Sequence, residues 1–353
     1  MIAPDDRPEP DRAGDAPHPR ETARLFGQEA AEAAFLDAWN TGRLHHGWLL
    51  TGPTGVGKAT LAWRIARFLL TDPPHPAETL DPTAGHPALP RIRALSEPSL
   101  ILLRRPWDDK AKRLKAQVTV DEVRRLGAFF GLTAGGRRVV LVDAADDLNP
   151  NAANAILKLL EEPPAGATLL LICHSPARLL PTIRSRCRVL RLGPLGPGPL
   201  AAAIEQAGGD PSVAPLAGGS VGAALELAEG GAEIYAALVD LFARAPMDRK
   251  AARALSDACA GRAGLPVLDR TLTALDRLLH RAARAGLLGT GDFGEAEAAT
   301  LGRLAPHDAA ARDWARLAQE IGDRTAHARA VNVDPAAIVW DALARVDAQA
   351  RRV

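Results

Sequence analysis

The stretch Gly47-Trp-Leu-Leu-Thr-Gly-Pro-Thr-Gly-Val-Gly-Lys-Ala59 decides the fold. Its first five residues form a short apolar run that predicts a strand. The remainder has the form G-x-x-x-x-G-K and opens a segment with helical spacing. A strand, this glycine-rich turn and a helix in that order are typical of a phosphate-binding loop, or P-loop. There the backbone N–H groups of the turn and the positive end of the helix dipole hold phosphate groups.

The predicted nucleotide site consists of four loop residues and one strand-end acid, namely Gly52, Gly55, Gly57, Lys58 and Asp143. Lys58 is one of only six lysines in a chain with 37 arginines, and it supplies a compact, flexible point charge. Asp143 ends an apolar run that begins at Val139, as expected of an acid that polarises a bound metal ion. A carboxylate that merely caps a nearby turn is the alternative for Asp143.

Two groups that ATP hydrolysis needs are absent. A working P-loop has Ser or Thr after its lysine to hold Mg²⁺, whereas this chain has Ala59, and Thr60 points about 100° away around the helix. The position after Asp143, where hydrolysing relatives place Glu, is Ala144. Because each such part contributes orders of magnitude in rate, we expect no intrinsic ATPase and no required cofactor. Passive binding of ATP or ADP stays open. A small-molecule P-loop kinase would need an acceptor site that the sequence does not reveal.

The strand-like runs place the P-loop in an α/β domain. They alternate with helical segments between Arg24 and Leu192, which predicts a parallel sheet covered on both faces. The runs are Gly47–Thr51, Leu100–Leu103, Val139–Val142, Leu169–Cys173 and Arg188–Leu192. A Gly- and Pro-rich linker follows at 193–199, and the rest has helical spacing. We expect a flexible tail at 1–20, the α/β domain at 21–195, a small helical domain at 196–245 and a helical C-terminal domain at 246–353.

Composition excludes several classes of function. The 353 residues carry a formal charge of +1, so bulk electrostatics would not bind nucleic acid. Three cysteines at wide spacing give neither a disulfide framework nor a zinc module, and Cys173 lies in an apolar run that suggests a buried position. No apolar run is long enough for a membrane span and the start does not read as a signal peptide, which favours a cytoplasmic protein.

Four segments resemble the AAA+ clamp-loader family of bacterial DNA polymerase III. They are Leu44–Ala59, Val118–Arg124, Asn151–Pro164 and Leu180–Cys187, and the resemblance is good over about residues 24 to 245 but loose beyond. It implies an AAA+ P-loop domain, a small helical lid domain and an all-α C-terminal collar domain. Many members carry a four-cysteine zinc module, but residues 71–99 here contain no cysteine and only His75 and His86. We therefore expect no metal site.

The resemblance also implies a choice between two kinds of subunit. A motor subunit would have Ser or Thr at position 59, Glu at position 144 and a sensor Arg where this chain has Gly222. All three are absent, so we expect a non-catalytic subunit, with an ATP-hydrolysing motor as the alternative. The implied partners are gamma/tau motor subunits and a delta subunit in one ring, and through that ring the sliding clamp and primed DNA. DNA-directed DNA polymerase activity would belong to the holoenzyme.

Arg186 lies in the motif Ser185-Arg-Cys187, and the resemblance implies that it acts in trans as an arginine finger toward ATP on a neighbouring motor subunit. A guanidinium group can spread positive charge over the γ-phosphate oxygens in the transition state. The alternative is a surface arginine paired with a carboxylate of its own chain. Cys187 has no evident redox role.

The basic stretch from Arg104 to Lys115 is the densest positive patch in the sequence. A solvated hairpin is one interpretation, because Trp107 is its single aromatic residue and two aspartates dilute the charge. Contact with the DNA phosphate backbone inside an assembled ring is the other. The last apolar pattern, after Asp334-Pro335, predicts an amphipathic helix that packs in its own domain or against other subunits.

Overall fold

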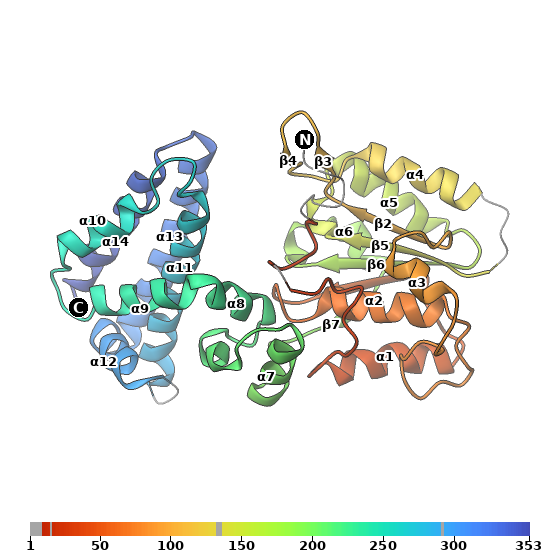
Figure 1. Ribbon diagram of the computed structural model, residues 1–353, viewed down its shortest axis with the longest axis horizontal. Coiled ribbons are helices and arrows are strands. Elements are labelled where there is room, and N and C mark those ends of the chain that lie inside the picture. Colours follow the sequence, from red (N-terminus) through yellow and green to blue (C-terminus); the bar gives the residue numbers. More distant parts are fainter. Residues whose placement is uncertain (1–8, 15, 132–135, 291–292) are drawn as a thin grey trace. The chain divides into compact units, whose positions relative to one another are not determined.

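A computed structural model describes residues 9–14, 16–131, 136–290 and 293–353 (Figure 1). The chain divides into two compact units, Met1–Leu225 and Glu226–Val353. The first contains a parallel sheet with helices, and the described part of the second is entirely helical. The predicted fold class is therefore confirmed, whereas the predicted boundaries at 195 and 245 stay predictions. Among the described helices none is both long and apolar enough to cross a bilayer.

Five parallel strands form the sheet of the first unit, in the order β2-β5-β6-β1-β7. Their bounds are β1 Gly47–Thr51, β2 Leu100–Arg104, β5 Arg138–Asp143, β6 Ala167–Cys173 and β7 Arg188–Arg191. Each coincides with a predicted apolar run to within two residues. Because β1 lies inside the sheet, paired with both β6 and β7, the P-loop that follows it begins at the carboxyl end of the strands, between β6 and β7.

Helices cover both faces of this sheet (Figure 1). The helices α1 Glu29–Asn40, α2 Lys58–Leu69 and α3 Ala88–Arg93 contribute to one core, and α4 Val120–Gly131, α5 Pro150–Glu161 and α6 Pro181–Ser185 contribute to the other. Short 3₁₀ turns lie at Ala145–Asp147 and Pro176–Arg178. Successive β5 residues enter opposite cores, since side chains alternate along a strand: Leu141 faces α2 and Val142 faces α5. Burial on both faces explains the unbroken apolar runs.

Three helices begin directly after residues whose side chains favour a helix start, and the start predicted after Asp334 is confirmed. Asn149 Oδ1 accepts a hydrogen bond from the N–H of Ala152 at 2.8 Å, with Pro150 in the first helical position of α5. Asp334 Oδ2 does the same for Ala337 at 3.3 Å at the start of the last helix. α4 begins directly after Thr119. Satisfying a backbone donor in the first turn fixes where each helix begins.

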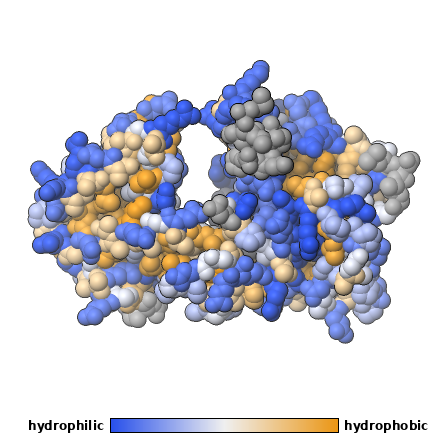
Figure 2. Space-filling view, viewed as in Figure 1, coloured by the Kyte–Doolittle hydropathy of each residue, from blue (hydrophilic) through white to orange (hydrophobic). Residues whose placement is uncertain are grey.

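The remaining helices follow the sheet. In the first unit these are α7 Pro197–Gln206, a 3₁₀ segment Pro211–Leu216 and α8 Val221–Glu226, which ends at the unit boundary. The second unit contains a π turn at Leu227–Gly231, then α9 Ala232–Leu241, α10 Arg249–Asp257, α11 Leu265–Leu288, α12 Glu295–Leu304, α13 Asp308–Ala330 and α14 Pro335–Ala350. Its two longest helices, α11 and α13, pack against each other. Apolar residues also reach the surface of this unit (Figure 2), among them Leu287 and Leu288 at the end of α11.

Residues 1–8 and 15 of the expected flexible tail lie outside the described residues. The described part of the tail is packed against the first unit, where the His18 side chain is buried. The Arg67 guanidinium of α2 donates to the carbonyl oxygens of Arg20 and Thr22, both at 2.8 Å. Composition alone does not reveal such contacts, because the partners on α2 are more than 40 residues away in sequence.

We expect Gly52→Ala to lower the free energy of unfolding by about 2 to 4 kcal/mol. Gly52 has φ of 146°, and an added Cβ would lie 2.1 Å from the carbonyl oxygen of Leu192, which the β7 end places beside β1. Urea unfolding of the purified chain, followed by circular dichroism, measures the change.

Gly42→Ala is the matched control. Gly42 also has positive φ, at 68°, but nothing lies within 4 Å of an added Cβ. Its substitution should cost only the backbone strain, about 1 kcal/mol. Equal costs for the two variants would contradict the close contact between Gly52 and Leu192.

Candidate functional site

The P-loop connects β1 to α2 in the geometry that its sequence predicts. Gly55 and Gly57 adopt positive φ of 77° and 100°, and Gly57 is the N-terminal cap of α2. These angles are favourable only for glycine, and they turn the chain tightly into the helix. The loop therefore keeps the backbone of a phosphate-binding site.

Lys58 bonds to the loop itself. Its side chain is buried, and Nζ donates to the carbonyl oxygens of Gly52 at 2.7 Å and Pro53 at 2.5 Å. Burial lowers the pKa of Lys58 to about 8, against an opposing effect of the Asp143 charge. In this arrangement backbone oxygens of the P-loop accept the hydrogen bonds of the ammonium group. In a P-loop that binds nucleotide, the same ammonium group contacts phosphate.

The segment before α8 packs directly on the P-loop. The N–H of Val221 donates to the carbonyl oxygen of Gly55 at 2.9 Å, and Ser220 Oγ donates to that of Thr54 at 3.0 Å. Gly222, at the position of the expected sensor Arg, packs so closely that a Cβ there would lie 3.3 Å from Cα of Gly55. The absence of a side chain at Gly222 therefore permits backbone packing over the mouth of the loop.

Asp143 lies at the end of β5, on the same sheet edge as the P-loop. Burial raises the pKa of its carboxyl group to about 7, with a further increase from the Asp11 charge and a decrease from Lys58. Within the described residues its carboxylate accepts no hydrogen bond from a turn, which removes the support for a capping role. Ala144, which follows it, is buried, so that no carboxylate lies where hydrolysing relatives carry one.

The two acids that follow Ala144 have structural roles. Asp146 accepts hydrogen bonds from the N–H groups of His174 and Ser175, at 2.5 and 2.9 Å, and from the Cys173 thiol at 3.3 Å. Asp147 pairs with Arg105 at 3.3 Å. Neither acid replaces the missing water-activating group, because each already binds a protein partner.

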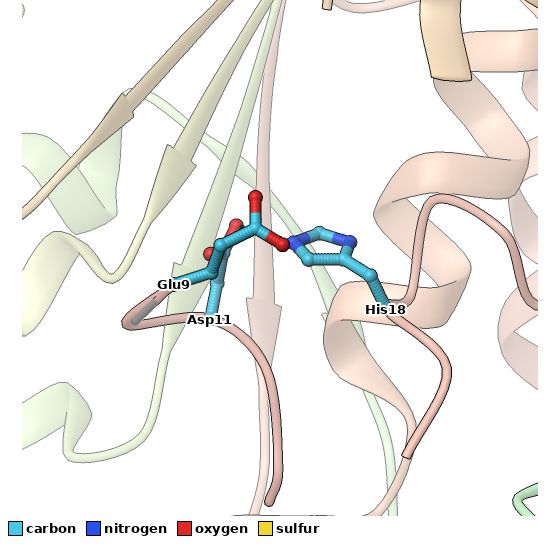
Figure 3. Close-up of side chains that lie close together, drawn as sticks. All are labelled: Glu9, Asp11 and His18. Carbon is cyan, nitrogen blue, oxygen red and sulfur yellow. Dashed lines mark ion pairs between the residues drawn. The ribbon is translucent and has the colours of Figure 1, made fainter. Parts of the chain in front are cut away.

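An acidic and histidine cluster from the N-terminal segment lies beside this edge (Figure 3). Candidate ligand atoms of Glu9, Asp11 and His18 all lie within 4.8 Å of one another, and His18 Nε2 is 3.1 Å from Asp11 Oδ2. Two guanidinium groups contact the same carboxylates: Arg104 reaches both Glu9 and Asp11, and Arg20 lies 2.7 Å from Glu9. Since these arginines already balance the acids, we interpret the cluster as an ion-pair network that anchors the segment. No motif in the sequence predicts this network.

Arg186 lies at the C-terminal end of α6, on an exposed part of the chain. Its Nη2 is 2.9 Å from Glu161 Oε1, and its Nη1 donates to the carbonyl oxygen of Thr182 at 3.1 Å. The neighbouring Cys187 thiol is inert, because burial raises its pKa to about 12. Cys173 is fully buried as predicted, and burial raises its pKa to about 12 as well.

The structure brings the predicted nucleotide-site residues together but separates Arg186 from them. β7 begins two residues after Arg186, and its first residue, Arg188, pairs with Trp48 at the start of β1. The P-loop instead follows Thr51, at the end of β1. Because these strands are parallel, Arg186 and Lys58 lie toward opposite edges of the sheet.

We expect the contribution of Asp143 to the free energy of unfolding to fall as pH rises from about 4 to 7. The fall is at most about 1.4 kcal/mol per pH unit. Folding raises the pKa of Asp143 from 3.8 to about 7, so the folded chain holds a proton that the unfolded chain has lost. Asp143→Asn has no proton to lose. Its stability relative to the natural chain should therefore increase through this interval and become constant above it.

Urea unfolding across this pH range measures the difference between the two proteins. Asp240→Asn, at an exposed acid of the helical unit, is the control. A difference between natural and Asp143→Asn chains that did not vary with pH would refute burial of an ionisable Asp143.

The family described as DNA polymerase III, delta subunit, matches residues 27–196. A DNA polymerase III subunit delta-prime of Pseudomonas aeruginosa is 42% identical over 144 residues, 40% of this chain and 41% of that protein. The delta-prime subunit of Escherichia coli is 34% identical over 159 residues, 44% of this chain and 45% of that protein. A subunit gamma of Buchnera aphidicola is 30% identical over 179 residues, 49% and 45% of the two chains.

The chain thus spans less than half the length of these curated relatives. The matched region contains the whole sheet, the P-loop and the Ser185–Cys187 motif. Over residues 27–196, just under half of its length, the chain is thus similar to the DNA polymerase III delta-prime proteins.

Proposed function

We propose that this chain is a non-hydrolysing clamp-loader subunit of the DNA polymerase III holoenzyme. It assembles in the cytoplasm with gamma/tau motor subunits and a delta subunit, and helps the ring load the sliding clamp onto primed DNA. Within the ring, Arg186 serves the ATP site of a neighbouring motor subunit. The DNA-directed DNA polymerase activity belongs to the holoenzyme and not to this chain.

The placement of Arg186 carries this proposal. Arg186 lies beside the start of β1, and the P-loop follows the end of β1. The five residues of this strand span about 16 Å. An arginine finger must contact the γ-phosphate oxygens directly, so Arg186 is out of reach of its own loop. The nucleotide it serves must therefore belong to another chain.

The pairing of Arg186 with Glu161 is compatible with that role. The two side chains are 39% and 42% exposed, and an ion pair with that much solvent contact contributes at most about 1 kcal/mol. A γ-phosphate with its higher charge can replace such a carboxylate. Glu161 thus holds the guanidinium group at the surface through an ion pair that contributes little to the stability of the fold.

The P-loop contacts argue against the motor alternative. Lys58 bonds to the carbonyl oxygens of its own loop, and Val221 closes on Gly55. Nucleotide binding would have to break these bonds, and it would gain no hydroxyl ligand for Mg²⁺ at Ala59. We propose that the loop serves as a structural joint, so that no cofactor is required and passive binding of ATP or ADP is weak. No metal has a role in this proposal.

The purified chain should hydrolyse no MgATP above background, because Ala59 and Ala144 replace the metal-holding and water-activating groups. Phosphate release in a coupled assay measures the rate. Lys58→Ala is the control for contamination, since a contaminating ATPase survives it. Turnover that depends on Mg²⁺ and on Lys58 would establish the motor alternative.

In a complex reconstituted with motor and delta subunits, Arg186→Ala should reduce clamp- and DNA-stimulated ATP hydrolysis by about 10²-fold or more. The variant loses the charge that stabilises the γ-phosphate in the transition state. Size-exclusion chromatography would show that the complex still forms. Unchanged stimulated hydrolysis would refute the finger assignment while leaving membership of the complex intact.

Glu161→Gln is the matched variant for this experiment. It breaks the same ion pair but leaves the guanidinium group in place. Stimulated hydrolysis should remain at the natural level or rise slightly. If Glu161→Gln were as damaging as Arg186→Ala, Arg186 would act through the fold of its own chain.

A further inference from the structure

The hairpin formed by β3 Trp107–Asp108 and β4 Arg113–Leu114 carries a cluster of exposed cations that the proposed function has not used so far. It lies in the first unit, between β2 and α4 (Figure 1). The cluster consists of Lys110, Lys112, Arg113 and Lys115, all of them exposed. Three of the six lysines in the chain lie within residues 110–115.

Ion pairing distinguishes this tip from the base of the same hairpin. At the base, Arg104 pairs with Glu9 and Asp11, and Arg105 pairs with Asp147. At the tip, none of the four cations forms an ion pair with a carboxylate within the part of the chain that the structure describes. The base arginines therefore stabilise the fold, and the tip cations are available to a partner.

The tip itself contains two acids, Asp108 and Asp109, and its charge stays positive with both of them counted. Asp108 Oδ1 accepts hydrogen bonds from the N–H groups of Lys110 and Ala111, both at 2.9 Å, and so shapes the turn. With Asp109 included, residues 108–115 carry four cations against two carboxylates, a local charge of +2 in a chain whose total is +1. This turn thus carries a local excess of positive charge.

The hairpin presents these cations on a defined scaffold. Trp107 lies opposite Leu114 across the two strands, and the N–H of Lys115 donates to the carbonyl oxygen of Pro106 at 2.9 Å. Both apolar side chains of this pair are only partly exposed, and Ala111 is the sole exposed apolar residue of the tip. Protein interfaces usually depend on buried aromatic or aliphatic anchors, which this tip does not offer. Compact, exposed lysine charges suit phosphate groups instead.

We propose that the β3–β4 hairpin binds the phosphate backbone of nucleic acid, without reading its sequence. The proposal rests on the proposed function, in which the assembled ring encloses primed DNA. It assigns one contact with that DNA to this chain. Because the contact is electrostatic, it should show the salt dependence of counterion release, with a slope of about 0.9 per neutralised phosphate.

The test uses the full chain in the reconstituted complex and a fluorescein-labelled primed-template duplex, with affinity measured by fluorescence anisotropy over a series of salt concentrations. The variant combines Lys110→Gln, Lys112→Gln, Arg113→Gln and Lys115→Gln. Losing up to four phosphate contacts should weaken binding by about tenfold or more at low salt. The slope of log affinity against log salt should become shallower by about 3.

The matched control removes the same charge from scattered positions of the same unit, through Arg43→Gln, Arg93→Gln, Arg124→Gln and Arg125→Gln. All four are exposed arginines outside the hairpin. This control should leave both the affinity and the salt slope close to natural values. An equal effect of the two variants would mean that net charge and not the hairpin matters, which would overturn the proposal.

Two further outcomes separate this proposal from the proposed function. If the hairpin variant assembled and bound DNA with unchanged affinity and slope, the hairpin contact would be refuted and the clamp-loader role would stand. If the variant failed to assemble, while its natural counterpart did, the hairpin would bind an acidic protein surface and the proposal would fail. If the natural chain itself did not assemble, fluorescence anisotropy would be measured with the chain alone. Salt-dependent DNA binding by the natural chain that is lost in the hairpin variant would support the hairpin contact. No salt-dependent DNA binding by the natural chain would refute it.

Discussion

The parallel pairing of the sheet is the constraint on which the rest of this structure depends. Because all five strands run the same way, every strand ends at one edge and every return connection enters at the other. The P-loop and Asp143 therefore meet at the first edge, and Arg186 lies toward the second. One sheet thus presents a nucleotide-binding loop and a potential arginine finger in opposite directions. Under the proposed function, Arg186 therefore acts on the nucleotide of a neighbouring subunit.

At the first edge, contacts within the protein hold the P-loop. Lys58 bonds to the P-loop carbonyls, and Val221 and Ser220 bond to the same loop from the following helical segment. Burial keeps the pKa of Asp143 high and that of Lys58 low, so that both groups favour their neutral forms more than exposed ones would. The loop is thereby joined to the helical segment that follows the sheet in the same unit.

Charge in this chain is nearly balanced overall but unevenly assigned. Arginines near the sheet edge are paired: Arg104 anchors the N-terminal segment and Arg105 holds Asp147. The cations of the β3–β4 tip have no such partners within the described residues. This division follows from position, because side chains at the sheet edge meet acids of other segments, whereas a projecting turn meets solvent. It explains how a chain with a formal charge of +1 can still offer a local phosphate contact.

The sequence by itself determined the local features: the five strands from their apolar runs and the start of α14 from Asp334. These depend on neighbours within a few residues, where propensity and hydrogen-bond geometry suffice. Only the tertiary structure decided that the described tail is docked, that Gly222 packs on Gly55, and that Arg186 is remote from Lys58. Each of these joins residues far apart in sequence, up to 166 positions for the bond between Ser220 and Thr54. No local pattern encodes such pairs, because they exist only after the sheet has brought its connections together.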